Sequence, residues 1–101
     1  MSYIFYDDIE GYSGTLTAAG TATLTATHFN TCCGIEITND GNTDITFQYD
    51  GRSYTLGTVK AGESHFEPMT FQAVLLTNLS ATVAGTYRVR MGTQTIATKF
   101  N

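Results

Sequence analysis

The sequence is poor in charge and in proline, and it contains no tryptophan. Charged residues make up 14% of its 101 residues, against about 25% in typical soluble domains. No apolar run approaches the roughly 18 residues that a membrane-spanning helix needs, so we expect no membrane partner. The first residues include neither a basic segment nor a long apolar one, which predicts no secretion signal and synthesis in the cytoplasm.

Cysteine is nearly absent, and the two cysteines, Cys32 and Cys33, are adjacent. Neighbouring cysteines can join only through a strained ring, so we expect free thiols rather than a disulfide framework. With His28 they include metal-binding atoms, but an extended strand points the two thiols to opposite sides and a fourth ligand is not in view. Asp7–Glu10 lacks the ligand spacing of a calcium loop and is interpreted as a solvated acidic turn. We predict no metal site and no cofactor.

Residues that could perform catalysis are also scarce. The chain has only two histidines, His28 and His65, and neither belongs to a recognisable motif with a nucleophile or an acid–base partner. We therefore expect that the protein is not an enzyme.

Basic residues are absent from the first half of the chain. Residues 1–51 contain seven acids and no Lys or Arg, whereas residues 52–101 contain five bases and two acids. The resulting net charge of −4 argues against nucleic acid as a partner. We favour the interpretation that strands from the two halves pair and interleave their charges. The alternative is a two-poled molecule that docks with its own copies or with a charged lattice.

Threonine is abundant, at 19 residues, and it alternates with small apolar residues from Thr15 to His28. This period of two predicts a strand with one apolar and one hydroxyl face. Gly20 keeps the phase without a side chain, which predicts a bend where a long strand passes from one sheet to another. The chain length predicts a single domain, residues 1–101.

Alternating apolar residues predict further strands. They are expected at Tyr3–Tyr6, Ile35–Ile37, Ile45–Tyr49, Tyr54–Leu56, Ser64–Glu67, Met69–Leu79, Tyr87–Met91 and Thr95–Phe100. Asp50-Gly51 predicts a two-residue hairpin turn, and Lys60–Glu63 predicts another turn. The whole pattern predicts an all-β domain, an antiparallel β-sandwich or jelly roll of about eight strands.

The segment Met69–Leu79 is ambiguous, because its apolar residues also fit one face of a helix that would begin after Pro68. Thr70 and Thr77 are poor helix formers and the neighbouring segments are β, so we favour a strand in which Phe71, Ala73 and Leu75 share one face.

Five residues are candidates for a partner interface: Arg88, Arg90, Tyr3, Tyr12 and Tyr54. Arg88 and Arg90 share one face of a predicted strand, where they could clamp carboxylates of a partner. The competing interpretation, which has more weight, is cross-strand pairing with acids of this chain. The tyrosines are available to stack on sugars, although strand tyrosines are more often half-buried packing residues.

Several hairpin segments carry a family resemblance. They are Ile37–Gly51 (ITNDGNTDITFQYDG), Tyr54–Leu56, Ala61–Glu63 and Gly85–Val89. In these segments the chain resembles small all-β virion proteins of tailed bacteriophages, and most of all head decoration, or cement, proteins. The resemblance implies a virion location and a β-sandwich or jelly-roll subunit, often a trimer, that binds assembled major capsid protein and bridges neighbouring capsomers. The alternative is a tail, baseplate or fibre module that recognises a host-surface glycan.

Overall fold

The computed structural model describes residues 2–27, 32–50 and 55–98, and it describes side chains between residues 10 and 92 of these ranges. The described residues form eight β-strands and no helix. They are β1 (Ser2–Leu16), β2 (Thr21–Thr25), β3 (Gly34–Asn39), β4 (Ile45–Tyr49), β5 (Gly57–Val59), β6 (Ser64–Glu67), β7 (Ala73–Asn78) and β8 (Gly85–Thr98). Within this part of the chain, no helix has the length and hydropathy needed to cross a membrane.

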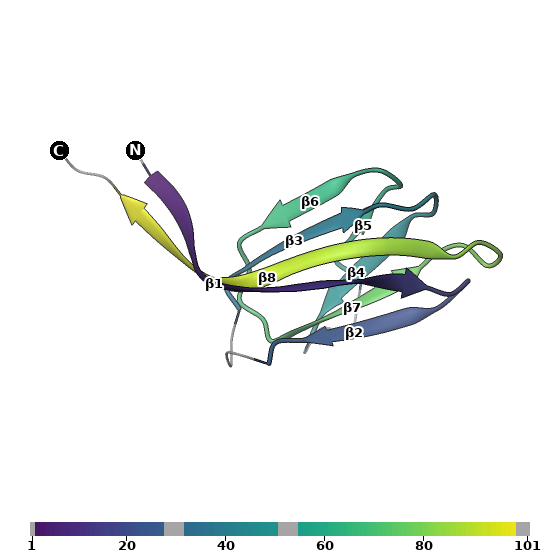
Figure 1. Ribbon diagram of the computed structural model, residues 1–101, viewed down its shortest axis with the longest axis horizontal. Helices are drawn as coiled ribbons and strands as arrows, with labels where there is room; N and C mark the ends of the chain where they lie inside the picture. Colours follow the sequence, from purple (N-terminus) through teal and green to yellow (C-terminus); the bar gives the residue numbers. More distant parts are fainter. Residues whose placement is uncertain (1, 28–31, 51–54, 99–101) are drawn as a thin grey trace.

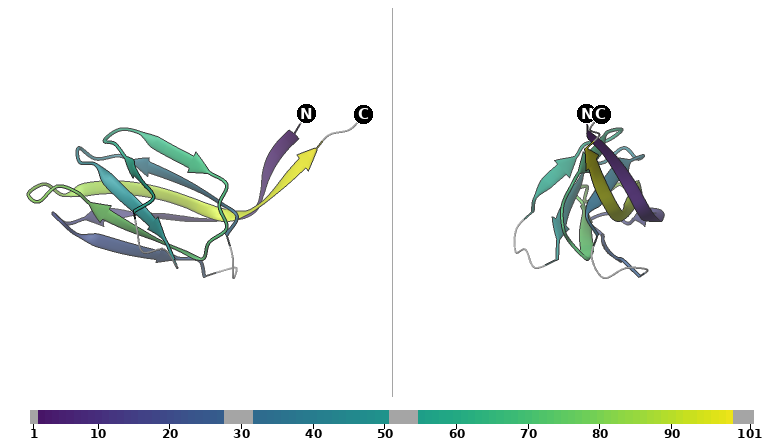
Figure 2. Two further views of the ribbon diagram at one scale, coloured as in Figure 1. Left: turned by 180° about the vertical axis from the view of Figure 1, so that it is seen from behind. Right: turned by 90° about the vertical axis from the view of Figure 1, so that its left-hand side faces the viewer.

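The strands form two four-stranded antiparallel sheets that pack face to face (Figures 1 and 2). Sheet A has the order β1-β8-β3-β6, and sheet B has the order β2-β7-β4-β5. In this order the strands of a sandwich follow the jelly-roll topology, in which the chain repeatedly crosses between the sheets. The prediction of an all-β antiparallel sandwich or jelly roll is therefore confirmed.

The core lies between the two sheets and follows the period-two pattern of the sequence. Along the central strands, as far as residue 92, buried side chains alternate with more exposed ones. The buried side chains of the four central strands, glycines aside, are Ile35, Ile37, Asn39, Ile45, Phe47, Tyr49, Val74, Leu76, Asn78, Tyr87, Val89 and Met91. Both sheets thus contribute their inner faces to one shared core.

The segment Thr15–His28 forms two strands rather than one long strand, which corrects the prediction. β1 ends at Leu16 in sheet A, β2 begins at Thr21 in sheet B, and Gly20 N donates to the Thr17 carbonyl at 2.8 Å. A Cβ atom on Gly20 would lie 2.4 Å from Thr17 Oγ1 and 2.9 Å from its carbonyl oxygen, so the turn requires glycine. The chain does pass between sheets at Gly20, as expected.

The hairpin prediction is right that Ile45–Tyr49 pairs with a strand that follows it, but wrong about the turn and about the bounds of that strand: the partner is β5 (Gly57–Val59), not Tyr54–Leu56. A two-residue turn at Asp50-Gly51 would place Phe47 opposite Tyr54, but Phe47 pairs with Gly57. The reason is that Asp50 continues the pairing with β7: its N–H donates to the Ala73 carbonyl at 3.0 Å. The tip of the connection, residues 51–54, lies outside the described residues.

The ambiguous segment Met69–Leu79 contains a strand, β7, as favoured. Its inner face is nevertheless formed by Val74, Leu76 and Asn78, not by Ala73 and Leu75. The alternation of buried and exposed residues changes from odd to even positions before the strand begins. Phe71 is buried in an isolated bridge with Cys32, outside β7. The short strand at Ser64–Glu67 and the turn at Lys60–Glu63 are both found as predicted.

β1 and β8 are much longer than the other strands and extend beyond the sandwich (Figure 1). β3 pairs with β8 as far as Gly92; beyond it, residues 93–98 pair with residues 2–8, from Ser2 opposite Thr98 to Asp8 opposite Thr93. We call this pair of segments the terminal ribbon. It makes the molecule 54 Å long against 25 and 22 Å in its other dimensions. Asp7 and Asp8 therefore lie in strand β1 and not in the predicted acidic turn.

Two buried asparagines stabilise the loops at the end opposite the terminal ribbon. The Asn39 amide donates to the carbonyls of Thr43 at 2.6 Å and Val59 at 2.9 Å. The Asn78 amide donates to the carbonyls of Thr17 at 3.2 Å and Val83 at 2.9 Å. Each side chain thus satisfies buried backbone groups of two separate segments.

We predict that Asn39→Ala and Asn78→Ala each lower the free energy of unfolding by about 1–3 kcal/mol, because buried carbonyls lose their donors. Urea denaturation measures this directly. Asn42→Ala is the matched control, since Asn42 is exposed in the loop that follows Asn39. A change no larger than that of the control would refute the structural role of the asparagines.

Candidate functional site

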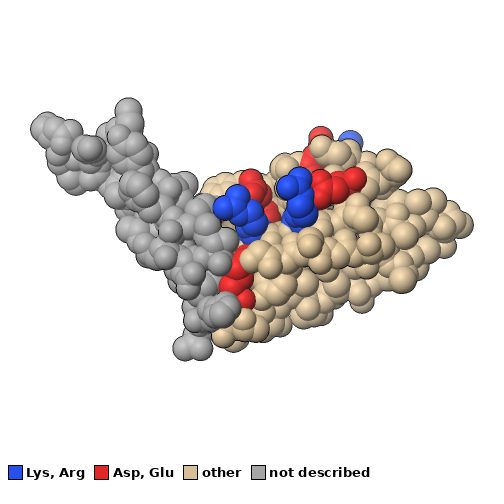
Figure 3. Space-filling view, in the orientation of Figure 1, with Lys and Arg blue, Asp and Glu red and all other residues tan. Residues whose placement is uncertain are grey.

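The outer face of sheet A carries the two candidate arginines in two cross-strand rows. In the first row, Arg90 of β8 lies between Gly11 of β1 and Glu36 of β3, with Phe66 of β6 at the sheet edge. Figure 3 shows basic and acidic side chains gathered on this part of the molecule, while most of the remaining visible surface has no charge.

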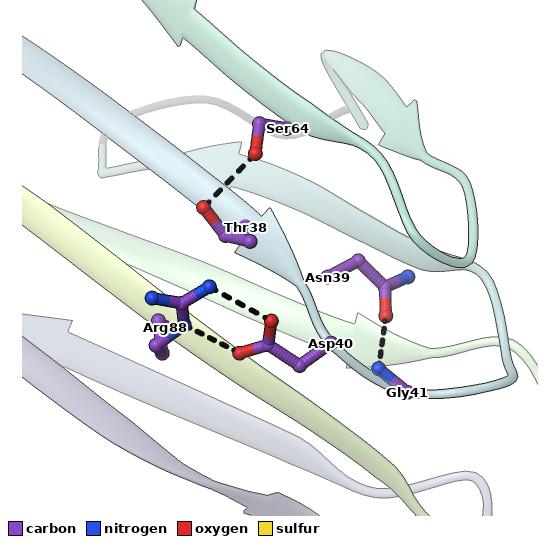
Figure 4. Close-up of polar contacts among 6 residues, drawn as sticks. All are labelled: Thr38, Asn39, Asp40, Gly41, Ser64 and Arg88. Atoms are coloured by element: carbon purple, nitrogen blue, oxygen red, sulfur yellow. Dashed lines mark hydrogen bonds and ion pairs between the residues drawn. The ribbon is translucent and has the colours of Figure 1, made fainter.

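The second row is centred on Arg88, between Ser13 of β1 and Thr38 of β3. Ser64 of β6 completes it, and its hydroxyl lies 3.0 Å from the Thr38 hydroxyl (Figure 4). Hydroxyl side chains thus flank Arg88 on both sides, whereas Arg90 lies between a glycine and an acid.

Arg88 is held firmly by an acid of this chain. Its Nε donates to Asp40 Oδ2 at 2.6 Å and its Nη2 donates to Asp40 Oδ1 at 3.0 Å (Figure 4). The guanidinium hydrogen bonds hold the pKa of the Asp40 carboxyl below its ordinary value of 3.8. Because Asp40 follows β3 directly, this bidentate pair fixes the start of the β3–β4 loop to β8.

Arg90 is held much more loosely. Its Nη1 lies 3.7 Å from Glu36 Oε1, which is an ion pair but too long for a hydrogen bond. The Arg90 side chain is 61% exposed. Both arginines therefore pair with acids from the first half of the chain, which confirms the interleaving of charges across the sheet. Their role toward a partner stays a prediction.

A hollow of about 290 Å³ lies on this face. It is lined by Gly11 and Ser13 of β1, Glu36 and Thr38 of β3, and Arg88 and Arg90 of β8. A Cβ atom on Gly11 would meet no other atom within 4 Å, so the missing side chain contributes open space. The sequence predicts the two arginines but not the hollow, because it is the pairing register of β1 with β8 that places Gly11 beside Arg90.

Glu10 forms a buried polar cluster behind this face that sequence reasoning missed. It is only 8% exposed and accepts hydrogen bonds from Thr27 N at 2.8 Å, Thr27 Oγ1 at 2.8 Å and the Tyr12 hydroxyl at 2.6 Å. These bonds join sheet A to the segment after β2. The sequence does contain a signal, because Glu10 is in phase with the buried Leu16 along β1.

Of the three candidate tyrosines, Tyr12 is the one whose side chain the structure describes. Tyr12 is half-buried, packs against the core, and has a raised pKa, chiefly because its hydroxyl donates to Glu10. Tyr3 lies in the terminal ribbon opposite Ala97, and Tyr54 lies outside the described residues. For Tyr12, the packing interpretation is therefore correct.

The two thiols are free, as expected, and differ in environment. Cys32 is fully buried, and burial raises the pKa of its thiol to about 11, whereas Cys33 is partly exposed. Among the side chains that the structure describes, no group of three or more His, Cys, Asp or Glu residues is arranged to hold a metal ion.

No protein-family model matches the chain, and no curated protein sequence matches it significantly. Among solved structures, the chain is similar to the Yersinia pseudotuberculosis-derived mitogen, with a TM-score of 0.48 and 13% sequence identity. That similarity covers 92% of this chain and 97% of the mitogen chain. The strand order itself places the chain in the class of jelly-roll domains.

We predict that the Arg88–Asp40 pair stabilises the fold at neutral pH and not in strong acid. A carboxyl whose pKa is lowered by folding contributes stability above its unfolded pKa, and this contribution is lost as pH falls through the folded pKa. Asp40→Asn should therefore lower the unfolding midpoint in urea at pH 7 and have a smaller effect near pH 2.

The control is the same substitution in an Arg88→Gln background, where Asp40→Asn should change little even at pH 7. An effect of Asp40→Asn that is equal at both pH values would contradict this origin of the stability.

We also predict that only one thiol reacts with Ellman's reagent in the native protein. Cys32 is buried and its raised pKa keeps it protonated, whereas the Cys33 side chain is accessible. Native Cys33→Ser should show no fast-reacting thiol, and both single variants should show one thiol in guanidinium chloride. Fast labelling of native Cys33→Ser would show that Cys32 is exposed.

Proposed function

We propose that the chain is a non-catalytic structural subunit of a bacteriophage virion, a decoration protein that binds the outer surface of the assembled capsid. Its partner is the major capsid protein, and a homo-oligomer, with a trimer favoured, is the form that binds. Jelly rolls are common among viral capsid and lectin domains, which is consistent with this proposal although a fold alone does not define a function.

The terminal ribbon is the observation that carries the proposal. Two-stranded ribbons are marginally stable by themselves, and each strand leaves one edge of backbone donors and acceptors without a neighbour. Within the described residues, the segments Ser2–Asp8 and Thr93–Thr98 pair with each other and with no third strand. A ribbon of this kind is well suited to add its edges to a neighbouring subunit.

The surface beside the terminal ribbon supports the same function. The hollow at Gly11 and Arg90 begins within a few residues of the last ribbon pair, Asp8 opposite Thr93. The ribbon and the outer face of sheet A thus form one continuous region along β1 and β8. We expect this region to face the capsid.

Stabilisation of the capsid would follow from mass action. A subunit that binds the assembled lattice but not separate capsid proteins stabilises the assembled state by its binding free energy. Because a lattice offers many equivalent sites, small contributions at each site add up, and an oligomer gains further by binding several sites at once.

The alternative, a tail or fibre module that binds host glycan, has less support in the structure. Sugar recognition in shallow sites relies on exposed aromatic rings, and Tyr12 is half-buried with its hydroxyl bonded to Glu10. The experiment below nevertheless separates the two functions.

We predict that purified particles of the phage that encodes this sequence contain the chain in many copies, located on the outside of the head. Quantitative mass spectrometry gives the copy number, and cryo-electron microscopy gives the location. Added to particles that lack it, the purified chain should co-sediment saturably, and it should not bind dissociated capsid protein. Location on the tail with binding to host glycan would establish the alternative, and absence from particles would refute both.

A further inference from the structure

We propose that the hollow beside Gly11 is a binding site for a single carboxylate of the partner protein, and that Arg90 is the residue that binds it. This inference rests on the proposed function, because it takes the outer face of sheet A as the surface that meets the partner. It assigns different roles to the two arginines: Arg90 binds the partner, and Arg88 stabilises the protein itself.

Arg90 has unused hydrogen-bonding capacity. A guanidinium has five N–H donors, and within the described residues its polar contact is the ion pair with Glu36 at 3.7 Å. With its side chain 61% exposed, Arg90 can reach an incoming carboxylate without breaking a hydrogen bond of its own. A new pair with ideal bidentate geometry would be stronger than the existing contact.

Arg88 lacks this freedom although it lies two residues away on the same face. Two of its nitrogens already donate to the two oxygens of Asp40, at 2.6 and 3.0 Å. A partner carboxylate at Arg88 would have to compete with a bidentate pair that also holds the β3–β4 loop. The difference between the two arginines is therefore one of geometry, since both side chains are similarly exposed.

The hollow provides the space that the carboxylate needs. Gly11 lies directly opposite Arg90 in the β1–β8 register, and the position of its absent side chain is open. Ser13, which lies in the next row, also lines the hollow, and its hydroxyl can donate to a second carboxylate oxygen. A side chain at position 11 would occupy this space without disturbing the backbone, because a Cβ atom there meets no neighbour within 4 Å.

The charges around the hollow favour a monoanion. Glu36 lines the hollow and Asp40 lies beside Arg88, so a doubly charged phosphate would meet two nearby acids. Within the lining of the hollow the aromatic residue is Tyr12, and because it is half-buried it offers little ring surface for a glycan to stack on. A Glu or Asp side chain on the surface of the partner has the matching charge, size and geometry.

Nuclear magnetic resonance titration of the labelled protein at low salt tests this inference. The probe is N-acetyl-glutamate-N-methylamide, and the matched control probe is the corresponding glutamine compound. We expect saturable shifts of the Gly11, Ser13 and Val89 amides with a dissociation constant weaker than about 1 mM, because one exposed ion pair supplies less binding free energy than that value requires. The glutamine compound should cause no saturable shift at these positions.

Three variants assign the roles. Arg90→Gln should weaken binding of the glutamate probe by about tenfold or more, whereas Arg88→Gln should change it less than about twofold while lowering the urea midpoint. Gly11→Val should remove binding by filling the hollow, and Gly11→Ala provides a smaller change if the valine variant does not fold. Equal effects of the two arginine variants, or equal shifts with the glutamine probe, would overturn the inference.

The outcomes also separate this inference from the proposed function. If the chain decorates particles and Arg90→Gln decorates them equally well, the carboxylate site is refuted and the function stands. If the glutamate probe binds at Gly11 and Arg90 but particles lack the chain, the site stands and the proposed function is refuted.

Discussion

The alternation of β8 between two environments is the constraint on which the rest of the structure depends. Tyr87, Val89 and Met91 are buried in the core, and Arg88 and Arg90 between them point to the outer face. Because β8 pairs with β1 on one side and β3 on the other, a shift of one residue would bury both arginines and expose the core. The same strand thus fixes the sandwich and presents the candidate site.

The sequence predicted those parts of the fold in which local alternation decides the structure. Ser64–Glu67, followed by Pro68, forms an edge strand with the predicted bounds, and Ile45, Phe47 and Tyr49 face the core as expected. The wrong predictions concern places where hydrogen bonds to residues distant in the sequence determine the structure. The Asp50 carboxylate accepts hydrogen bonds from the backbone N–H groups of Gln72 and Ala73 at the start of β7, and these bonds take the place of a tight turn. No local pattern of the sequence predicts them.

The candidate site was predictable in its residue types and not in its geometry. The spacing of Arg88 and Arg90 indicated one shared face, and the charge asymmetry of the two halves indicated acids on neighbouring strands. Which acid each arginine meets depends on the register of β3 with β8, and that register places Glu36 opposite Arg90. Arg88 forms a bidentate pair and Arg90 a loose one. The difference arises because Arg88 is paired with Asp40, a loop residue whose orientation depends on the whole fold.

We propose that the chain meets its partner through β1 and β8, along the terminal ribbon and the adjoining outer face of sheet A. Amide hydrogen–deuterium exchange of the chain, free and bound to capsid particles, tests this most directly. We expect binding to slow exchange chiefly in residues 2–14 and 88–98. Slower exchange at the opposite end instead, in the loops held by Asn39 and Asn78, would contradict it.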